Sequence, residues 1–318
     1  MKKILVVGAL GQIGSELLIA LREKYGADNV IATDIRFRNK EDEGDGPFEI
    51  VDCTDIRSLS EVVKKYQIDT IFHLAAILSA AAEEKPQFAW NLNMNGLYNV
   101  LEISREHKCS VFVPSSIAAF GPNTPQDFTP QDTIQRPTTI YGISKVSGEL
   151  LCDYFHKRFG VDTRGVRFPG IISNKTLPGG GTTDYAVEIY YEAIKHKKYF
   201  CYLGPNTQLD MMYMPDAVKA SIDLMEADPS KLKHRNAFNI TAMSINPEDL
   251  ANVIKKYIPT FQIQYRVDPM KQRIADSWPN SLDDSAAKEE WGWKPDYDLE
   301  TMTKDMFEKL AVKLGVEL

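Results

Sequence analysis

Residues 4–14 read Ile-Leu-Val-Val-Gly-Ala-Leu-Gly-Gln-Ile-Gly, a short apolar run that leads into three glycines. The apolar run predicts a buried strand, and the amphipathic stretch Ile13–Tyr25 after it predicts a helix. Gly8, Gly11 and Gly14 then form the turn between them, where glycine lets the backbone bend sharply and approach a pyrophosphate at the amino end of the helix. A tight turn without a ligand would use the same residues, so the glycines alone do not establish a nucleotide-binding site.

A carboxylate stands where such a turn needs one. Asp34 follows the apolar run Val30–Thr33, and lies twenty residues beyond Gly14. A carboxylate at the end of the second strand of a nucleotide-binding βαβ unit accepts hydrogen bonds from the adenosine ribose hydroxyls. Its charge also repels a 2′-phosphate, so we expect NAD rather than NADP, although the nearby Arg36 compensates part of that repulsion.

Strand-like and helix-like stretches alternate up to about residue 170. Helices are predicted near Ile56–Tyr66 and Phe88–His107, and strands at Thr70–Leu74 and Val111–Pro114. The strands are continuous Ile/Leu/Val runs, as in a parallel sheet with helices on both faces. We therefore predict an α/β fold: a doubly wound Rossmann sheet with a smaller carboxyl-terminal substrate lobe.

The predicted domains are residues 1–170, the NAD-binding Rossmann core, and residues 171–318, mainly a substrate lobe with some segments that return to the core. Two long loops, Gly121–Pro137 and Asn174–Asp184, are rich in Pro, Gly, Thr and Asp and are expected to border the substrate cleft. Asn246 is expected to begin a helix in the second half.

Composition narrows the classes of function. The chain has 318 residues, a net charge of -7 and no basic stripe, which excludes nucleic acid as a partner. The first apolar run is too short for a signal peptide or a membrane span, so we expect a cytoplasmic protein with no membrane partner. The four cysteines are far apart and the histidines are not clustered, so neither a metal site nor disulfides are expected.

Tyr141 and Lys145 lie four residues apart, on one face of a helix if the segment is helical. An ammonium so close to a phenol favours the phenolate, which can accept a proton. Ser115 and Ser116 follow the strand Val111–Pro114, at the sheet edge where ligands of such folds bind. A surface helix pair and an ordinary serine turn would leave the same pattern.

Taken together and in order, these motifs resemble those of the extended short-chain dehydrogenases/reductases related to UDP-galactose 4-epimerase. The matching residues are Gly8/Gly11/Gly14, Asp34, His73-Leu74-Ala75-Ala76, Asn93-x-x-Gly96, Ser115-Ser116, Tyr141/Lys145 and Arg167-Phe168-Pro169-Gly170. The resemblance implies that Ser116, Tyr141 and Lys145 are catalytic.

The same resemblance implies a set of NAD-binding residues. Asp52 and Cys53 correspond to the adenine contact, Asn93 supports the central helix and strand, and Phe168 to Ile171 run along the nicotinamide. The full set is Gly8, Gly11, Gln12, Ile13, Gly14, Asp34, Arg36, Asp52, Cys53, Leu74, Ala75, Ala76, Asn93, Tyr141, Lys145, Phe168, Pro169 and Ile171.

Within the family, the residues after Ser116 are Ile117, Ala118 and Ala119, so the acid that a dehydratase carries there is missing. The loop Pro178–Ala186 is rich in backbone donors and hydroxyls, which suits a small carboxylate, and it is expected to cap a helix with Thr or Asp. With Ala75–Ala80 and Ile274–Pro279, it resembles the NAD-dependent L-threonine 3-dehydrogenases of the epimerase-like branch. The implied substrate residues are Ser79, Ser116, Tyr141, Thr182, Thr183 and Asp184.

That resemblance implies an amino-acid substrate, L-threonine, oxidised at its Cβ hydroxyl without a metal. It also implies a homodimer formed by the helices near Phe88–His107 and Ile140–Phe159. Some alternatives stay open: a sugar-nucleotide epimerase or reductase, with Arg266, Lys271 and Arg273 as unplaced cations, and a regulatory protein that only senses NAD. The glycine run could be a linker and Trp278 a core residue. A pure sensor has no use for an intact Ser116, Tyr141 and Lys145 set.

Overall fold

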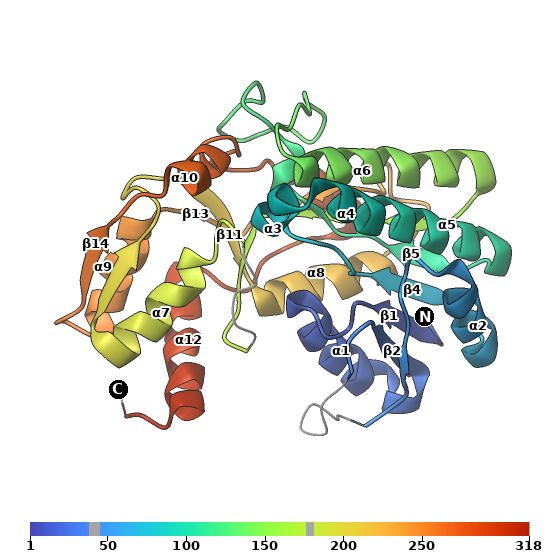
Figure 1. Cartoon of the computed structure of the whole chain (residues 1–318), viewed down its shortest axis with the longest axis horizontal. Helices are drawn as coiled ribbons and strands as arrows, with labels where there is room; N and C mark the ends of the chain where they lie inside the picture. Colours follow the sequence, from blue (N-terminus) through green and yellow to red (C-terminus); the bar gives the residue numbers. More distant parts are fainter. Residues whose placement is uncertain (38–44, 176–180, 318) are drawn as a thin grey trace.

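The computed structural model describes residues 1–37, 45–175 and 181–317. Figure 1 shows the amino terminus in a part built around a sheet and the carboxyl terminus in a smaller, mainly helical part beside it. Within the described residues, no helix is both long enough and apolar enough to cross a membrane.

The central sheet has six strands in the order β3-β2-β1-β4-β5-β7, and every pairing is parallel. Its strands are β1 (Ile4–Val7), β2 (Val30–Asp34), β3 (Phe48–Ile50), β4 (Thr70–His73), β5 (Ser110–Phe112) and β7 (Thr163–Arg164). The four predicted strands are confirmed, with shorter ends at β4 and β5. The sequence did not indicate β3 because it is only three residues long and partly exposed.

Side chains of β1 alternate between two separate hydrophobic cores. Ile4 and Val6 pack with α1 (Gln12–Tyr25) and α8 (Met214–Glu226). Leu5 and Val7 pack with α2 (Ile56–Tyr66), α5 (Gly96–His107) and α6 (Ile140–Phe159). Since successive residues of a strand point to opposite faces, helices cover both faces of the sheet. The doubly wound Rossmann prediction is confirmed.

The helix predicted near Phe88–His107 is interrupted rather than regular. After α3 (Ser79–Glu84) the chain forms α4 (Pro86–Trp90), a π-helical turn η3 (Asn91–Asn95) and then α5. The Asn93 side chain in that turn accepts a hydrogen bond from Ile77 N at 2.9 Å and donates to Ser144 Oγ at 3.3 Å. π-Helical turns often occur at functional sites. This one fastens the segment after β4 to α6.

Among the described residues, the smaller part contains two short sheets and four helices. One sheet joins β9 (Gly170–Ile172), β11 (Leu209–Tyr213) and β13 (Met243–Ile245), and the other joins β10 (Lys198–Cys201) and β14 (Gln262–Tyr265). The helices are α7 (Tyr185–His196), α9 (Pro247–Tyr257), α10 (Pro269–Ala275) and α12 (Leu299–Leu314). Asn246 caps α9 through a capping box, as predicted.

Segments from the second half of the chain return to the first part. β12 (Phe238–Asn239) pairs with β8 (Val166–Phe168), which also pairs with β6 (Ser115–Ser116). α8 and α11 (Ser285–Trp291) contribute to the core around α1. The second half therefore serves both parts of the molecule.

A buried ion pair joins α6 to the β6-β8-β12 sheet. The Arg167 guanidinium donates to both carboxylate oxygens of Glu149, from Nε at 3.1 Å and Nη2 at 2.9 Å, and both side chains are buried. Ser115 Oγ also donates to Glu149, and Arg167 Nη1 donates to Asn239 Oδ1 at 3.0 Å. The pair holds the helix that carries Tyr141 and Lys145 beside the strand that carries Ser116.

Glu149→Ala should lower the free energy of unfolding by about 3–5 kcal/mol, because it leaves the Arg167 charge buried without its partner. Denaturant unfolding followed by circular dichroism measures the change. Glu308→Ala, which breaks an exposed pair with Lys304 (N···O distance 3.8 Å), should cost less than about 1 kcal/mol. Equal losses of unfolding free energy in the two variants would show that the buried pair stabilises the fold no more than the exposed pair does.

Candidate active site

The turn between β1 and α1 brings the backbone very close to the chain after β4. Gly8 has a φ of 84°, and a Cβ placed on it would lie 2.7 Å from Ala75 N. A Cβ on Gly14 would lie 2.3 Å from Gly8 O. Gly11 is the N-cap of α1, and no side chain caps that helix within the described residues. The turn therefore points the first amides of α1 at whatever binds there, as a pyrophosphate site requires.

A cleft of about 510 Å³ lies beside this turn. Eight of the residues predicted to bind NAD line it: Gly8, Gly11, Asp34, Arg36, Cys53, Leu74, Ala75 and Ala76. Gln12, Ile13, Phe168, Pro169 and Ile171 line a second cleft of about 140 Å³ that shares Leu74 and Ala76 with the first. The two clefts thus adjoin one another, as the adenosine and nicotinamide ends of a dinucleotide would require.

Three predicted NAD residues lie outside both clefts. Gly14 packs against the turn, and Asn93 fastens the backbone at Ile77. Asp52 accepts hydrogen bonds from Thr54 N and Thr54 Oγ1, both at 2.8 Å, and so shapes a turn. These residues support the walls of the clefts.

Asp34 and Arg36 form a close ion pair. Arg36 donates to Asp34 from N at 3.1 Å, from Nε at 2.9 Å and from Nη2 at 3.1 Å, and Leu10 N donates at 3.0 Å. Burial alone would raise the pKa of Asp34, but these hydrogen bonds outweigh it and hold that pKa below its ordinary value. Asp34 is therefore ionised, and the ribose hydroxyls would share its oxygens with Arg36.

Ser116, Tyr141 and Lys145 all line the 140 Å³ cleft. Thr139 Oγ1 accepts from Gly142 N at 3.1 Å and so begins α6 just before Tyr141. Lys145 Nζ lies 5.3 Å from the centre of the Tyr141 ring and donates to Pro114 O at 2.8 Å. The serines form their own strand, β6, two residues beyond the end of β5. A phenol, an ammonium and a hydroxyl are thus gathered at one opening.

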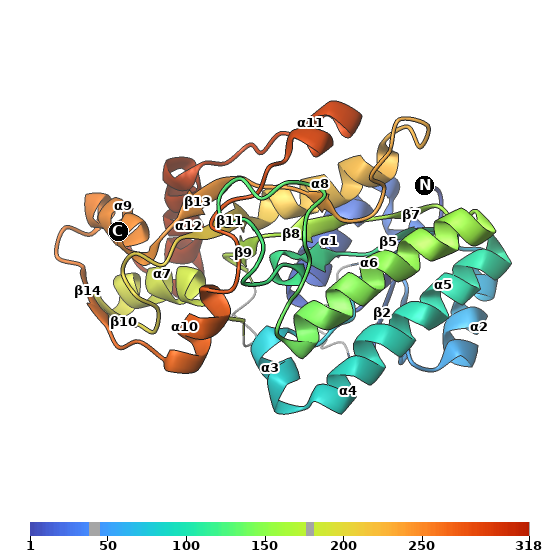
Figure 2. The same ribbon diagram turned by 90° about the horizontal axis from the view of Figure 1, so that it is seen from above.

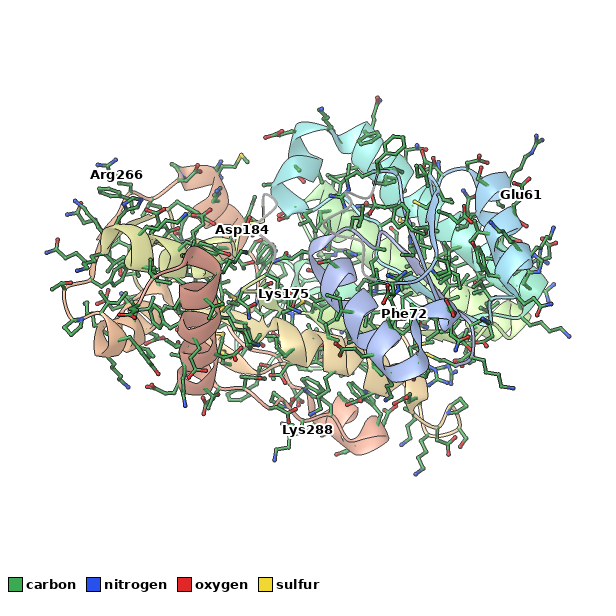
Figure 3. All side chains as sticks on the ribbon, turned by 90° about the horizontal axis from the view of Figure 1, so that it is seen from below. Glu61, Phe72, Lys175, Asp184, Arg266 and Lys288 are labelled. Atoms are coloured by element: carbon green, nitrogen blue, oxygen red, sulfur yellow. The ribbon has the colours of Figure 1, made fainter. Side chains whose placement is uncertain are left out.

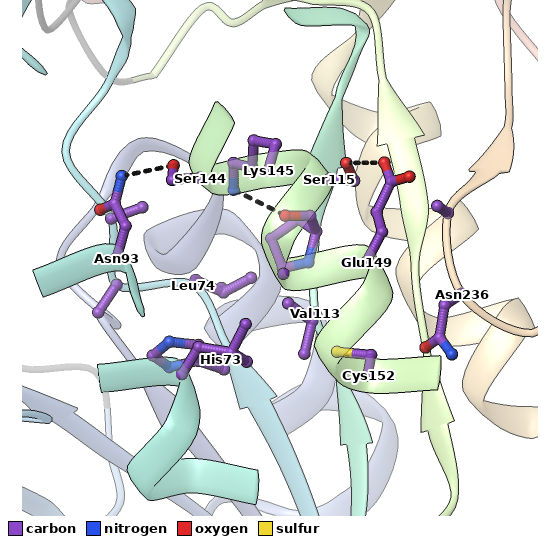
Figure 4. A pocket seen from close by; sticks show the side chains of 16 residues that line it. His73, Leu74, Asn93, Val113, Ser115, Ser144, Lys145, Glu149, Cys152 and Asn236 are labelled. Carbon is purple, nitrogen blue, oxygen red and sulfur yellow. Dashed lines mark hydrogen bonds between the residues drawn. The ribbon is translucent and has the colours of Figure 1, made fainter. Parts of the chain in front are cut away.

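His73 lies behind this group at the end of β4, and Figure 4 shows it below Leu74. Burial, and then the nearby Lys145 charge, lowers the pKa of His73 to about 3. The imidazole is therefore neutral. It adds no positive charge that would compete with Lys145.

On its other side the 140 Å³ cleft is lined by Ser79 of α3 and by Gly181, Thr182, Thr183 and Asp184. Thr182 is 1% exposed, and its Oγ1 has no hydrogen-bond partner among the described residues. A buried hydroxyl without a partner is costly unless a ligand or a water satisfies it. Residues 178–180, the first part of the predicted carboxylate loop Pro178–Ala186, lie outside the described residues.

Asp184 does not cap α7 with its side chain as predicted. It occupies the N-cap position, but its backbone is already helical, at φ −61° and ψ −20°, and its carboxylate accepts from Gly181 N at 2.7 Å. An N-cap needs extended backbone to turn its side chain toward the following amides. Asp184 instead ties Gly181 to the start of the helix.

The sequence predicted that the loop Gly121–Pro137 borders the substrate cleft, and it did not establish the place of Trp278. Gly121–Pro137 contributes no residue to either cleft, because it is fastened to the segment after Trp278, with Thr129 N donating to Ser281 O at 3.0 Å. Trp278 is 6% exposed, yet it lines the 140 Å³ cleft. It is therefore both a packed aromatic and a wall of the site.

The described residues contain no group of three or more His, Cys, Asp or Glu side chains placed to hold a metal ion. The four cysteines, Cys53, Cys109, Cys152 and Cys201, are buried free thiols.

Solved structures of named enzymes are similar to this one. L-threonine dehydrogenase from Clostridium difficile is 64% identical, with 98% of each chain covered and a TM-score of 0.96. L-threonine 3-dehydrogenase from Trypanosoma brucei is 41% identical, with 99% of each chain covered and a TM-score of 0.96. UDP-glucose 4-epimerase from Thermotoga maritima, at 23% identity, 98% and 99% coverage and a TM-score of 0.84, shares the fold.

Among curated relatives, an uncharacterised epimerase/dehydratase from Staphylococcus saprophyticus is 55% identical over the whole of both chains. Residues 4–241 match the model of the NAD dependent epimerase/dehydratase family. That match covers well over half of the chain and includes the glycine turn, Asp34, Ser116, Tyr141 and Lys145. The chain belongs to the NAD dependent epimerase/dehydratase family.

Proposed function

We propose that this protein oxidises the Cβ hydroxyl of L-threonine with NAD to give 2-amino-3-oxobutyrate. The observation that carries the proposal is the 140 Å³ cleft, where Ser116, Tyr141 and Lys145 face Thr182 and Thr183 across a small space. The neighbours named L-threonine dehydrogenase, at 41% and 64% identity over nearly the whole chain, support it.

A sugar-nucleotide epimerase or reductase fits the cleft less well, because a nucleoside diphosphate needs cations along its length. Lys145 is the one cationic side chain among the residues described as lining it. The cations considered from sequence lie elsewhere. Arg266 stacks on Phe200 at 3.9 Å and Lys271 on Tyr202 at 3.7 Å, measured to the ring centres.

In the proposed mechanism Tyr141, as a phenolate, accepts the proton of the threonine hydroxyl. Ser116 Oγ holds the hydroxyl oxygen, and the Lys145 ammonium stabilises the phenolate. Bound NAD supplies the acceptor for the hydride that leaves Cβ. Removal of the proton and of the hydride turns the Cβ–OH group into a ketone.

The other wall of the cleft holds the amino-acid end of the substrate. We assign the carboxylate and ammonium to Ser79, Thr182, Thr183 and Asp184, which together offer hydroxyl and carboxylate partners. Trp278 closes the cleft beside them and offers an apolar surface for the Cγ methyl.

We also propose a homodimer that pairs α5 and α6 with the same helices of a second copy. Figure 2 shows these two helices side by side along one edge of the molecule. Their outer faces expose large apolar side chains, including Tyr98 at 47%, Leu150 at 62% and Tyr154 at 52%. Exposed apolar surface of this extent is typical of an interaction site.

We further propose that the chain divides near residue 170 into an NAD-binding domain, residues 1–170, and a part that is mainly a substrate lobe, residues 171–318.

Tyr141→Phe should lower turnover of L-threonine by at least about a hundredfold, because it removes the group that accepts the proton. NAD should still bind, as a titration calorimetry experiment would show. Tyr257→Phe, on the exposed side of α9 and outside both clefts, should keep nearly the wild-type rate. Near-normal turnover by Tyr141→Phe would remove this phenol from the mechanism.

Asp34→Ala should weaken NAD binding and narrow the preference for NAD over NADP, because it removes two ribose hydrogen bonds and a negative charge at the 2′ position. It also frees the Arg36 guanidinium for a 2′-phosphate. The gain in kcat/KM with NADP should therefore be smaller in the double variant Asp34→Ala/Arg36→Ala. A wild-type enzyme that uses both cofactors equally would contradict the role of Asp34.

Substrate preference tests the assignment of the cleft. L-Serine lacks one methyl group, which is worth about 1–3 kcal/mol, so its kcat/KM should be about ten- to two-hundredfold lower than that of L-threonine. 1-Amino-2-propanol lacks the carboxylate, and each charged hydrogen bond contributes about 1.5–3 kcal/mol, so it should be the poorest of the three.

Thr183→Ala should raise the KM for L-threonine and leave the KM for NAD unchanged, since Thr183 is assigned to the substrate alone. NADH formation at 340 nm measures all of these rates. No activity with L-threonine, or efficient turnover of a UDP-sugar, would overturn the proposed function.

A further inference from the structure

Lys313, near the end of α12, reaches the chain that leads away from β9. Its ammonium donates to Lys175 O at 2.6 Å, to Asn174 O at 3.3 Å and to Tyr191 Oη at 3.0 Å. An ammonium has three N–H donors, and three oxygens surround this one. Tyr191 Oη in turn donates to Asn174 O at 3.3 Å. One side chain thus links α12, α7 and the residues after β9.

The same helix also holds the side chain of Asn174, which is buried. Asn174 Nδ2 donates to the Tyr213 hydroxyl, which donates to Asp305 Oδ2 at 2.6 Å. Asp305 lies two turns before Lys313 on α12 and pairs with Lys309 at 3.0 Å. Asn174 is therefore fixed through both its carbonyl and its amide.

A third contact fastens this segment to the NAD-binding part. Ser173 Oγ donates to Glu16 Oε1 on α1 at 2.5 Å and accepts from Lys175 N at 3.1 Å. Burial raises the pKa of Glu16, and the Ser173 hydrogen bond opposes that rise. Figure 3 shows Lys175 in the middle of the molecule, between α12 and α1, with Asp184 nearby.

In the sequence, Asn174 and Tyr191, which Lys313 contacts, lie on either side of Gly181–Asp184, which line the substrate cleft. β9 begins at Gly170, where a Cβ would lie 2.8 Å from Thr183 Cγ2, so the strand directly supports Thr183. Asp184 leads into α7, whose Tyr191 is the second partner of Lys313. Movement of Asn174 or of α7 would therefore shift Gly181–Asp184 relative to Tyr141.

We propose that Lys313 is a positioning residue for substrate binding, which braces Asn174, Lys175 and α7 against α12 and so sets the wall formed by Gly181–Asp184. The inference rests on the proposed function, because that function assigns this wall to the amino-acid end of the substrate. Lys313 does not line either cleft. Its loss should therefore weaken substrate binding and spare NAD.

The test compares Lys313→Met with the wild-type enzyme in steady-state kinetics. Methionine keeps most of the length of the side chain and removes all three donors. The KM for L-threonine should rise about five- to tenfold, while kcat and the KM for NAD stay within about twofold. Tyr191→Phe, which removes one shared partner and keeps the ring, should raise the KM for L-threonine by a smaller factor.

A second readout does not depend on activity. Trypsin cleaves after Lys175 only when that peptide bond can leave its hydrogen bonds and enter the protease, so cleavage there should be several-fold faster in Lys313→Met. Mass spectrometry of the 1–175 fragment measures the rate. Lys304→Met is the matched control: it removes an exposed lysine of the same helix, paired only weakly with Glu308 at 3.8 Å, and should change neither readout.

An unchanged KM for L-threonine and unchanged cleavage after Lys175 in Lys313→Met would overturn the proposal that Lys313 is a positioning residue. An equal rise in the KM for NAD would also overturn it, because it would indicate a general disturbance. A wild-type enzyme that is inactive on L-threonine would refute the proposed function instead, and the tryptic rates would still decide whether Lys313 holds this segment.

Discussion

The buried Glu149–Arg167 pair determines how the reacting groups are arranged. Tyr141 and Lys145 lie on α6, whereas Ser116 lies on β6, and Lys145 Nζ also donates to Pro114 O, just before β6, at 2.8 Å. Glu149 joins the two elements because it accepts from Arg167 on β8 and from Ser115 on β6. Arg167 then extends the network to Asn239 on β12. A buried charge pair is stabilising only when its hydrogen bonds are complete, and here α6, β6, β8 and β12 each contribute to the network.

Local sequence was sufficient to predict the cofactor half of the molecule. Strand β1 is an uninterrupted apolar run and β2 begins with one, and Gly8 and Gly14 are the residue type that the close approach to Ala75 and to Gly8 O requires. Each of these signals spans only a few residues, so it can be recognised without knowledge of the fold. The strand β3 and the π-helical turn around Asn93 were missed, because their stability comes from contacts with distant segments rather than from their own residues.

The site was predictable to the extent that its residues lie on recognisable motifs. Trp278 lines the same cleft as Tyr141, the loop Gly121–Pro137 packs on Ser281, and Lys313 donates to Asn174 O. In each case the two residues are more than a hundred positions apart in the sequence. No periodicity or spacing records such pairs. Asp184 illustrates the opposite case, in which a correct residue type before a helix predicted a cap, but the local backbone turned the carboxylate back to Gly181.

The two clefts differ in how the chain builds them, and this difference bears on what distinguishes members of the family. The 510 Å³ cleft is lined by the turn after β1, by residues at the ends of β2 and β4, and by residues of α3, α4 and η3. The 140 Å³ cleft adds Gly181–Asp184 and Trp278, which belong to segments held from outside the sheet by α12 and by β11 through Leu282 N and Asp210. An epimerase with 23% identity keeps the same fold, so the fold alone does not select the substrate. Under the proposed function, substrate choice resides in these added segments, and the side chains that hold them in place contribute to specificity together with those that line the cleft.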